Sequence, residues 1–444
     1  MRRCIVHFGM NKTGSSSIQS TLYNCSLSPE FHYIDIGVDN PTGPLLDAFM
    51  APKRRHNSIK SRSRKVTIEQ VKRRRSSVIN KLRSQLETAT APNLILSAEG
   101  LWRLTYKELL NLYQFIQPYV DKMEAVAYIR PPKGFMESNF QQLVKGGGVK
   151  ELDLTRFYPD YRERFEKFDD IFSTDNVQYW RFSPKHFPDN CVVRDFCSRL
   201  DIKAEIEVQR VNEGLSRNAT AALFSYRKFS DRFSERDRFN RENELLVRKM
   251  YELPGTKLRF SSKLVEPILE ERQEDISWME YRLQAPLIEE ITKYDDDAIQ
   301  MEEDLLSSDH STIVWLAEQA GTDYQDNGQP IPEQVAALMH KLRIKLASED
   351  AKQLPTRTAK ATTSINIKKL VRKAQKSYPK LQDQLSEKET VSLVRGVFNQ
   401  IIQELDTVET GAVSVPGLGK FTIREIEKTI EGQVKPEKRI VFTP

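Results

Sequence analysis

The chain has 444 residues, with 68 lysines and arginines against 62 aspartates and glutamates, so its formal net charge is +6 at pH 7. This length and a hydrophobic fraction of 39% are sufficient for two or three domains with real cores, which excludes a disordered chain. The four cysteines have no C-x-x-C spacing, and no run of roughly eighteen apolar residues occurs. We therefore expect a cytoplasmic protein without disulfide bonds, a signal peptide or a membrane partner.

The first predicted element is an apolar strand over residues 4–8, which leads into a turn rich in glycine and hydroxyl groups and then into a helix. Lys12, Thr13, Gly14 and the three serines Ser15, Ser16 and Ser17 form the turn. Backbone N–H groups in such a turn, together with the positive end of the following helix, bind phosphate-like anions. Gly9 and Gly14 have the spacing of the nucleotide-triphosphate loop, but Ser15 stands where that loop has its lysine, which disfavours an Mg-ATP site.

A second apolar run begins at Asn93 and ends in a polar turn at Glu99. Ligand sites in open α/β sheets gather at the carboxyl ends of the strands. Glu99 is therefore a candidate general base, and a helix cap or a surface acid is the alternative interpretation. His7, in the first strand, is a competing base or a packed and hydrogen-bonded side chain. The six histidines are scattered without zinc spacing, so we expect no metal.

The next predicted strand covers residues 124–130, and a proline-containing break precedes a helix that begins near Phe135. Arg130 ends this strand, and Ser138 follows it by eight residues on the helix. A guanidinium group with a hydroxyl partner suits a terminal phosphate group.

These two segments together resemble the sulfotransferases that use 3′-phosphoadenosine 5′-phosphosulfate (PAPS). The K-T-G-S-S-S turn is similar to their 5′-phosphosulfate loop, and Arg130, Pro132 and Ser138 are similar to their 3′-phosphate element. Phe135 replaces an arginine that many members have. The resemblance implies an α/β fold, a P-loop-like three-layer sandwich with a central parallel sheet. It covers residues 1–350, with a core over 1–310 and a helical extension over 311–350.

The resemblance also implies roles for individual residues. Residues 12–17 bind the 5′-phosphosulfate of PAPS, Lys12 stabilises the transferred sulfuryl group, and Glu99 deprotonates an acceptor hydroxyl, with a glycan as one candidate acceptor. Arg130 and Ser138 hold the 3′-phosphate. A further strand is predicted over residues 177–182, followed by a helical run from Asn218. Arg217 is a further candidate contact to the nucleotide, and Ser216 is either a contact or a helix cap.

The composition changes near residue 350, where a basic linker over residues 351–364 is predicted to lead into a C-terminal domain over residues 365–444. Helices are predicted over residues 365–376 and 387–405, and a glycine-rich hairpin follows. Val394, Val397, Ile401, Ile402 and Leu405 form the apolar stripe of the second helix.

This pattern resembles the bacterial histone-like HU and integration-host-factor family, and it implies a small α+β domain with a shortened arm. The resemblance implies DNA binding, or dimerisation to a homodimer, as the domain's role. The candidate phosphate contacts are Lys420, Arg424, Lys428, Lys435, Lys438 and Arg439.

Three functions follow from the sequence. The first is a PAPS-dependent sulfotransferase. The second is a non-catalytic DNA-binding or dimerising protein that acts through its HU-like tail. The third is a P-loop kinase, against which Ser15 and the Arg130 to Ser138 pair argue. The region from Leu152 to Leu305 contains no motif that identifies the acceptor.

Overall fold

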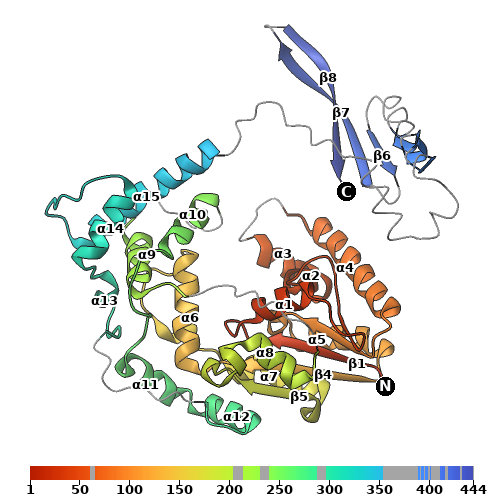
Figure 1. Ribbon diagram of the computed structural model, residues 1–444, viewed down its shortest axis with the longest axis horizontal. Coiled ribbons are helices and arrows are strands. Elements are labelled where there is room, and N and C mark those ends of the chain that lie inside the picture. Colours follow the sequence, from red (N-terminus) through yellow and green to blue (C-terminus); the bar gives the residue numbers. More distant parts are fainter. Residues whose placement is uncertain are drawn as a thin grey trace. The chain divides into compact units, whose positions relative to one another are not determined.

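The computed structural model describes residues 1–60, 66–203, 214–230, 240–287 and 297–353, together with residues 389–390, 392–394, 396–398, 401, 411–415, 419–430 and 433–443. The chain divides into two compact units, Met1–Leu354 and Pro355–Pro444. Each unit is described by itself below (Figure 1).

The first unit contains a five-stranded sheet in the order β2-β3-β1-β4-β5, and every neighbouring pair is parallel. Its strands are β1 Arg3–Gly9, β2 Phe31–Tyr33, β3 Asn93–Ser97, β4 Lys122–Ile129 and β5 Val177–Arg181. The strands that were predicted from the sequence at residues 4, 93, 124 and 177 are all present within this sheet.

Helices connect the strands and extend beyond them. Those within the sheet region are α1 Ser15–Asn24, α2 Thr42–Phe49, α3 Pro52–Lys60, α4 Ile68–Thr88, α5 Tyr106–Ile116, α6 Pro132–Lys145, α7 Tyr161–Phe172 and α8 Val192–Leu200. Those that follow are α9 Arg217–Phe229, α10 Arg241–Met250, α11 Ser262–Glu271, α12 Gln273–Leu283, α13 Glu303–Leu306, α14 His310–Ala320 and α15 Ile331–Gln353.

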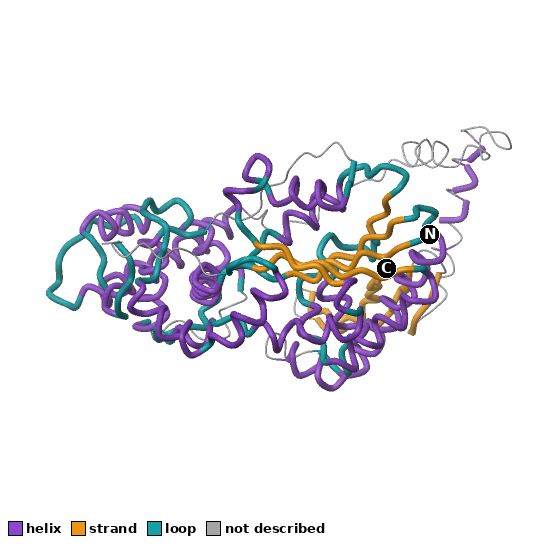
Figure 2. Tube along the Cα trace, turned by 90° about the horizontal axis from the view of Figure 1, so that it is seen from below, coloured by secondary structure: helices purple, strands orange, loops and turns teal. Residues whose placement is uncertain are grey.

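Both faces of the sheet are apolar because successive strand residues alternate between them. Ile5 belongs to a core cluster that includes side chains of α1 and α8. Its neighbour Val6 belongs to a second cluster that includes side chains of α4, α5 and α7. Figures 1 and 2 show helices on both sides of the sheet. The expected α/β architecture with a central parallel sheet is therefore confirmed.

The strand order determines where a ligand can bind. The chain passes from β1 to β2 and β3 on one side, and then crosses β1 to form β4 on its other side. Open parallel sheets bind ligands outside the carboxyl ends of the strands at this switch point. The turns after β1 and β4, which contain Lys12 and Arg130, lie at this position.

The last helices of the unit occupy most of the range expected to be a helical extension. α14 and α15 pack against the rest of the unit through Leu316, Met339 and Leu342, which belong to its main core. α15 continues to Gln353, three residues into the range predicted as a linker. The rest of that range, residues 354–364, and the predicted helix over 365–376 lie outside the described residues.

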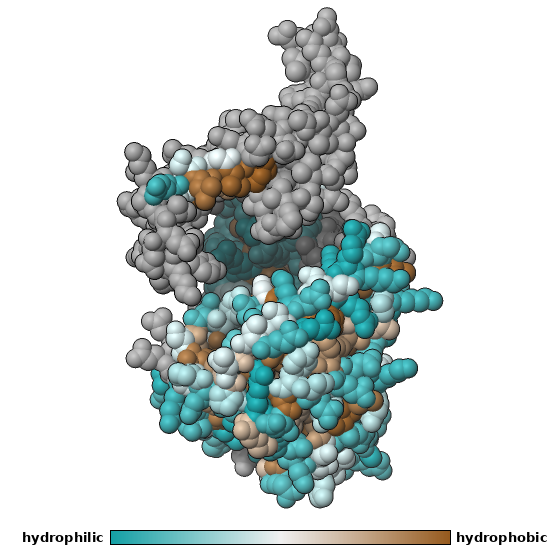
Figure 3. Space-filling view, turned by 90° about the vertical axis from the view of Figure 1, so that its right-hand side faces the viewer, coloured by the Kyte–Doolittle hydropathy of each residue, from teal (hydrophilic) through white to brown (hydrophobic). Residues whose placement is uncertain are grey.

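The second unit contains an antiparallel sheet of β6 Gly411–Val415, β7 Gly419–Ile430 and β8 Gln433–Thr443, in that order. The described residues between 389 and 401 are helical, within the predicted second helix. Leu393, Val397 and Phe398 of that segment are exposed apolar side chains in this unit. Figure 3 colours exposed apolar side chains brown. Among the described residues, no helix is both long and apolar enough to cross a lipid bilayer.

Candidate functional site

The turn between β1 and α1 is held by its own hydroxyl groups. Thr13 Oγ1 donates to the carbonyl oxygen of Met10 at 2.5 Å, and Ser15 Oγ donates to the same oxygen at 3.1 Å. Thr13 is fully buried, and Ser17 is also buried. These contacts close the turn. The first backbone N–H groups of α1, those of Ser15 and Ser16, have no acceptor within the helix.

Gly14 is required by the shape of this turn. It is the N-cap of α1 and has a φ of 77°, in the left-handed region. A Cβ atom at Gly14 would lie 2.6 Å from Cγ1 of Val192, at the start of α8. Glycine therefore permits both the left-handed backbone and the close packing of α8 beneath the turn.

Arg130, at the end of β4, ties that strand to the turn. Its Nη1 donates to the carbonyl oxygen of Lys12 at 2.7 Å, and its guanidinium carbon lies 5.7 Å from the ring centroid of Phe182. A guanidinium group has five N–H donors, and Arg130 also lines the cavity described below. Arg130 thus links the two segments that the sequence singled out separately.

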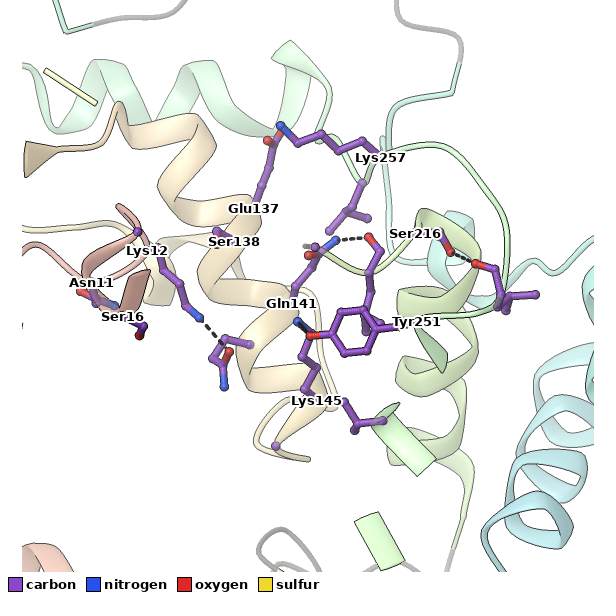
Figure 4. Close-up of a pocket in the computed structure, with 18 of the residues that line it drawn as sticks. Asn11, Lys12, Ser16, Glu137, Ser138, Gln141, Lys145, Ser216, Tyr251 and Lys257 are labelled. Carbon is purple, nitrogen blue, oxygen red and sulfur yellow. Dashed lines mark hydrogen bonds between the residues drawn. The ribbon is translucent and has the colours of Figure 1, made fainter. Parts of the chain in front are cut away.

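The side chain of Lys12 lies along α6. Its Nζ donates to Oε1 of Gln142 at 2.7 Å (Figure 4). Burial lowers the pKa of Lys12 to about 8, and the nearby positive charges of Lys145 and Arg130 act in the same direction. Glu99 opposes this shift because its negative charge favours the protonated amine. Near neutral pH Lys12 remains a cation facing the cavity.

Glu99 follows β3 and is half-buried. Burial raises the pKa of its carboxyl group, while the charge of Lys12 and the neighbouring side chain of Ser15 act in the opposite direction. A carboxylate with a raised pKa is a better proton acceptor, which suits a general base. A Cβ at Gly9 would lie 3.1 Å from the carbonyl oxygen of Glu99, so β1 and the turn after β3 approach closely here.

His7 is packed inside the sheet. It is fully buried, its Nδ1 lies 2.7 Å from Oγ of Ser97, and its ring is 5.1 Å from that of Phe196. Burial lowers the pKa of His7 to about 4. His7 does not line the cavity described next, so it is the packed side chain of the two alternatives.

One cavity brings the candidate residues together. Its volume is about 1190 Å³, which is enough for a nucleotide and part of an acceptor. The residues expected from the sequence that line it are Lys12, Gly14, Ser15, Ser16, Glu99, Arg130 and Ser138. Thr13 and Ser17 are buried and do not line it. Figure 4 shows Lys12 and Ser16 on one side and Ser138 on the adjacent helix α6.

The structure also places the three other residues that the resemblance singles out. Arg217 does not line the cavity: its Nε lies 3.5 Å from Oδ1 of Asp297, and its Nη2 donates to the carbonyl oxygen of Asp304 at 3.5 Å. Ser216 lines the cavity and is also a helix cap, since its Oγ accepts from the N–H of Ala219 at 3.1 Å. Phe135 is fully buried in the main core.

Several cavity residues were not predicted. Gln142 and Lys145 follow Ser138 on α6 at i+4 and i+7, so helical spacing alone could have identified them as one face. Asn243 and Tyr251 come from α10 and its end, about one hundred residues further along the chain. Nothing local in the sequence connects α10 with the turn after β1.

The register of the C-terminal hairpin arranges its predicted cations. Arg424 pairs with Arg439 and Lys428 with Lys435, whereas Lys438 pairs with Glu425. Since strand residues alternate between faces, one face carries five of the six candidates: Lys420, Arg424, Lys428, Lys435 and Arg439. Pro436 pairs with Glu427 within β8, away from the hairpin end between Ile430 and Gln433.

Within the described part of the chain, no group of three or more His, Cys, Asp and Glu side chains is arranged to hold a metal ion. Comparison of the chain with protein-family models, with curated proteins and with solved structures finds no match.

Proposed function

We propose that Met1–Leu354 is a PAPS-dependent sulfotransferase with a P-loop-like fold. The observation that carries this proposal is that Lys12, Glu99, Arg130 and Ser138, from three separate segments, line one cavity at the switch point of a parallel sheet. A nucleotide with phosphate groups at both ends of its ribose needs two separate anion sites. The turn at residues 12–16 and the Arg130–Ser138 pair provide them.

In the proposed reaction, the acceptor oxygen attacks the sulfur atom of PAPS and the bond from sulfur to the bridging oxygen breaks. Glu99 accepts the proton of the acceptor hydroxyl. Lys12 and the amides of the turn stabilise the negative charge that develops on the bridging oxygen and the sulfuryl group. The products are a sulfate ester and 3′-phosphoadenosine 5′-phosphate (PAP).

The kinase alternative is disfavoured by the contacts of the turn. In a Mg-nucleotide loop the hydroxyl after the lysine binds the metal ion. Here no lysine precedes Ser16, and the Ser15 hydroxyl donates to the carbonyl oxygen of Met10. The sulfuryl group carries less charge than a phosphoryl group, so Lys12 and backbone amides are adequate without a metal.

Calorimetric titration of PAP into variants of the full chain tests the two anion sites. Lys12→Ala and Arg130→Ala each remove a charged hydrogen-bond donor, so each is expected to weaken PAP binding by about tenfold to hundredfold. Lys107→Ala, an exposed lysine on α5 outside the cavity, is the matched control and should leave the affinity unchanged. Full affinity in both site variants would contradict the assignment.

For Pro355–Pro444 we infer DNA binding as a second function, because one face of the β7–β8 hairpin collects five basic residues. Exposed Leu393, Val397 and Phe398 favour homodimerisation of the same unit. A DNA retardation assay of the full chain at several salt concentrations gives the slope of the logarithm of the binding constant against the logarithm of the salt concentration. The double variant Arg424→Gln/Arg439→Gln should reduce the magnitude of this slope by about 2. Lys107→Gln/Lys150→Gln, which makes the same charge change at two exposed lysines of the first unit, is the control. An unchanged slope in Arg424→Gln/Arg439→Gln would contradict the inference.

A further inference from the structure

The cavity extends beyond the residues assigned to the nucleotide. From Lys12 it follows α6 to Lys145, where Asn243, Glu244 and Tyr251 form the opposite wall. Figure 4 shows Lys145 and Tyr251 side by side at the end of α6 that is remote from Glu137. This end has no role in the binding of PAPS as proposed above.

Lys145 is held in a fixed position at this end. Its Nζ donates to the hydroxyl of Tyr251 at 2.8 Å and lies 4.8 Å from the centroid of that ring. Its carbonyl oxygen accepts from Nη2 of Arg227 at 3.1 Å and from Nδ2 of Asn243 at 3.2 Å. Arg227 is fully buried and also donates to the carbonyl oxygen of Val144 at 3.2 Å, so α9 and α10 together fix the end of α6.

The charge of Lys145 is not neutralised by the cavity wall. Three carboxylates of the described residues line the cavity, and each interacts with another cation: Glu99 with the charge of Lys12, Glu137 with Lys133 at 2.7 Å, and Glu244 with Arg241 at 3.1 Å. Among the described residues, no carboxylate lies within ion-pair distance of Lys145. Burial lowers the pKa of Lys145 to about 8, which still leaves the amine protonated near neutral pH.

We propose that Lys145 binds a carboxylate of the acceptor, so that the acceptor is a hydroxyl compound that carries its own negative charge. A fixed, partly desolvated ammonium group without a carboxylate partner is a site for an anion. Lys12 donates to Gln142, which lies one helical turn before Lys145 on α6, so the two ammonium groups face the same cavity and the anion at Lys145 shares it with the reacting sulfuryl group. This inference rests on the proposed function.

Pairs of compounds that differ only in charge test the proposal. Glucuronate with glucuronamide, and 4-hydroxybenzoate with 4-hydroxybenzamide, are titrated calorimetrically into the full chain, both with saturating PAP and without it. At least one acid should bind about tenfold more tightly than its amide. In Lys145→Gln the difference should fall to within about twofold, whereas Lys145→Arg should retain it. Lys150→Gln makes the same charge change just beyond α6 and is the matched control.

Three outcomes would overturn the proposal. The first is that the wild-type chain prefers neither acid. The second is that Lys145→Gln keeps the preference. The third is that Lys145→Gln instead weakens PAP binding about tenfold, which would assign Lys145 to the nucleotide. Failure of PAP to bind the wild-type chain would contradict the sulfotransferase proposal itself, while the titrations without PAP would still decide whether Lys145 binds a carboxylate.

Discussion

Replacement of Gly14 by alanine should destabilise the first unit through two separable effects. A φ of 77° costs a residue with a Cβ atom about 1–2 kcal/mol. The new Cβ would lie 2.6 Å from Cγ1 of Val192, and the displacement that relieves this overlap costs about 1–3 kcal/mol. We therefore expect Gly14→Ala to lower the free energy of unfolding by about 2–5 kcal/mol.

A double-mutant cycle separates the two effects. Val192→Ala removes the clashing methyl group, so in that background Gly14→Ala should cost only the backbone part, about 1–2 kcal/mol. Urea denaturation followed by tryptophan fluorescence measures the first unit alone, because all four tryptophans lie in it: Trp102, Trp180, Trp278 and Trp315. An equal loss of stability in both backgrounds would refute the packing argument, and no loss in either would refute the left-handed turn.

Three further predictions concern the cavity. Arg130→Lys keeps the charge but loses the planar donor geometry and the bond to the turn, so PAP should bind about tenfold more weakly by calorimetry; equal affinity would contradict the role of the guanidinium group. The pKa of Lys12 is lowered to about 8, so PAP affinity should be constant from about pH 7, where both phosphate groups are ionised, up to that pKa, and fall by about tenfold per pH unit above it. Lys12→Arg should abolish this decline because arginine stays charged, and a decline that persists in this variant would assign it to another group. Glu99→Gln removes the negative charge that supports the protonated form of Lys12, so the decline should begin at lower pH; it should also reduce sulfuryl transfer by about hundredfold once an acceptor is known. An unchanged pH profile in Glu99→Gln would show that the two side chains do not interact.

Much of the sheet could be predicted from the sequence because its strands are short apolar runs that end in polar turns. The strand before Lys12 and the strand before Arg130 were both placed within two residues of the observed β1 and β4. Their parallel neighbours and the strand order could not be predicted in the same way, since β-sheet pairing joins residues far apart in the chain. Arg3 pairs with Asn93 and with Lys122, for example.

Those residues of the candidate site could be predicted that a short stretch of sequence identifies without its neighbours in space. Lys12 and Arg130 each follow a strand, and Ser138 lies on the helix after Arg130, so local patterns identify all three. Arg217 also follows a recognisable pattern, yet its position is determined by Asp297 and Asp304, which lie about 80–90 residues away in sequence. Tyr251 was missed for the corresponding reason, because its proximity to Lys145 depends on how α10 packs against the end of α6.

The most direct test of the central claim is calorimetric titration of PAP into the wild-type chain, with adenosine 5′-phosphate and ATP plus Mg²⁺ as controls. PAP contains both phosphate groups that the two anion sites are proposed to bind, and its use requires no knowledge of the acceptor. We predict binding in the micromolar range that needs no metal and is lost when the 3′-phosphate is absent. No binding of PAP by the folded chain, or equal binding of adenosine 5′-phosphate, would contradict the proposed function.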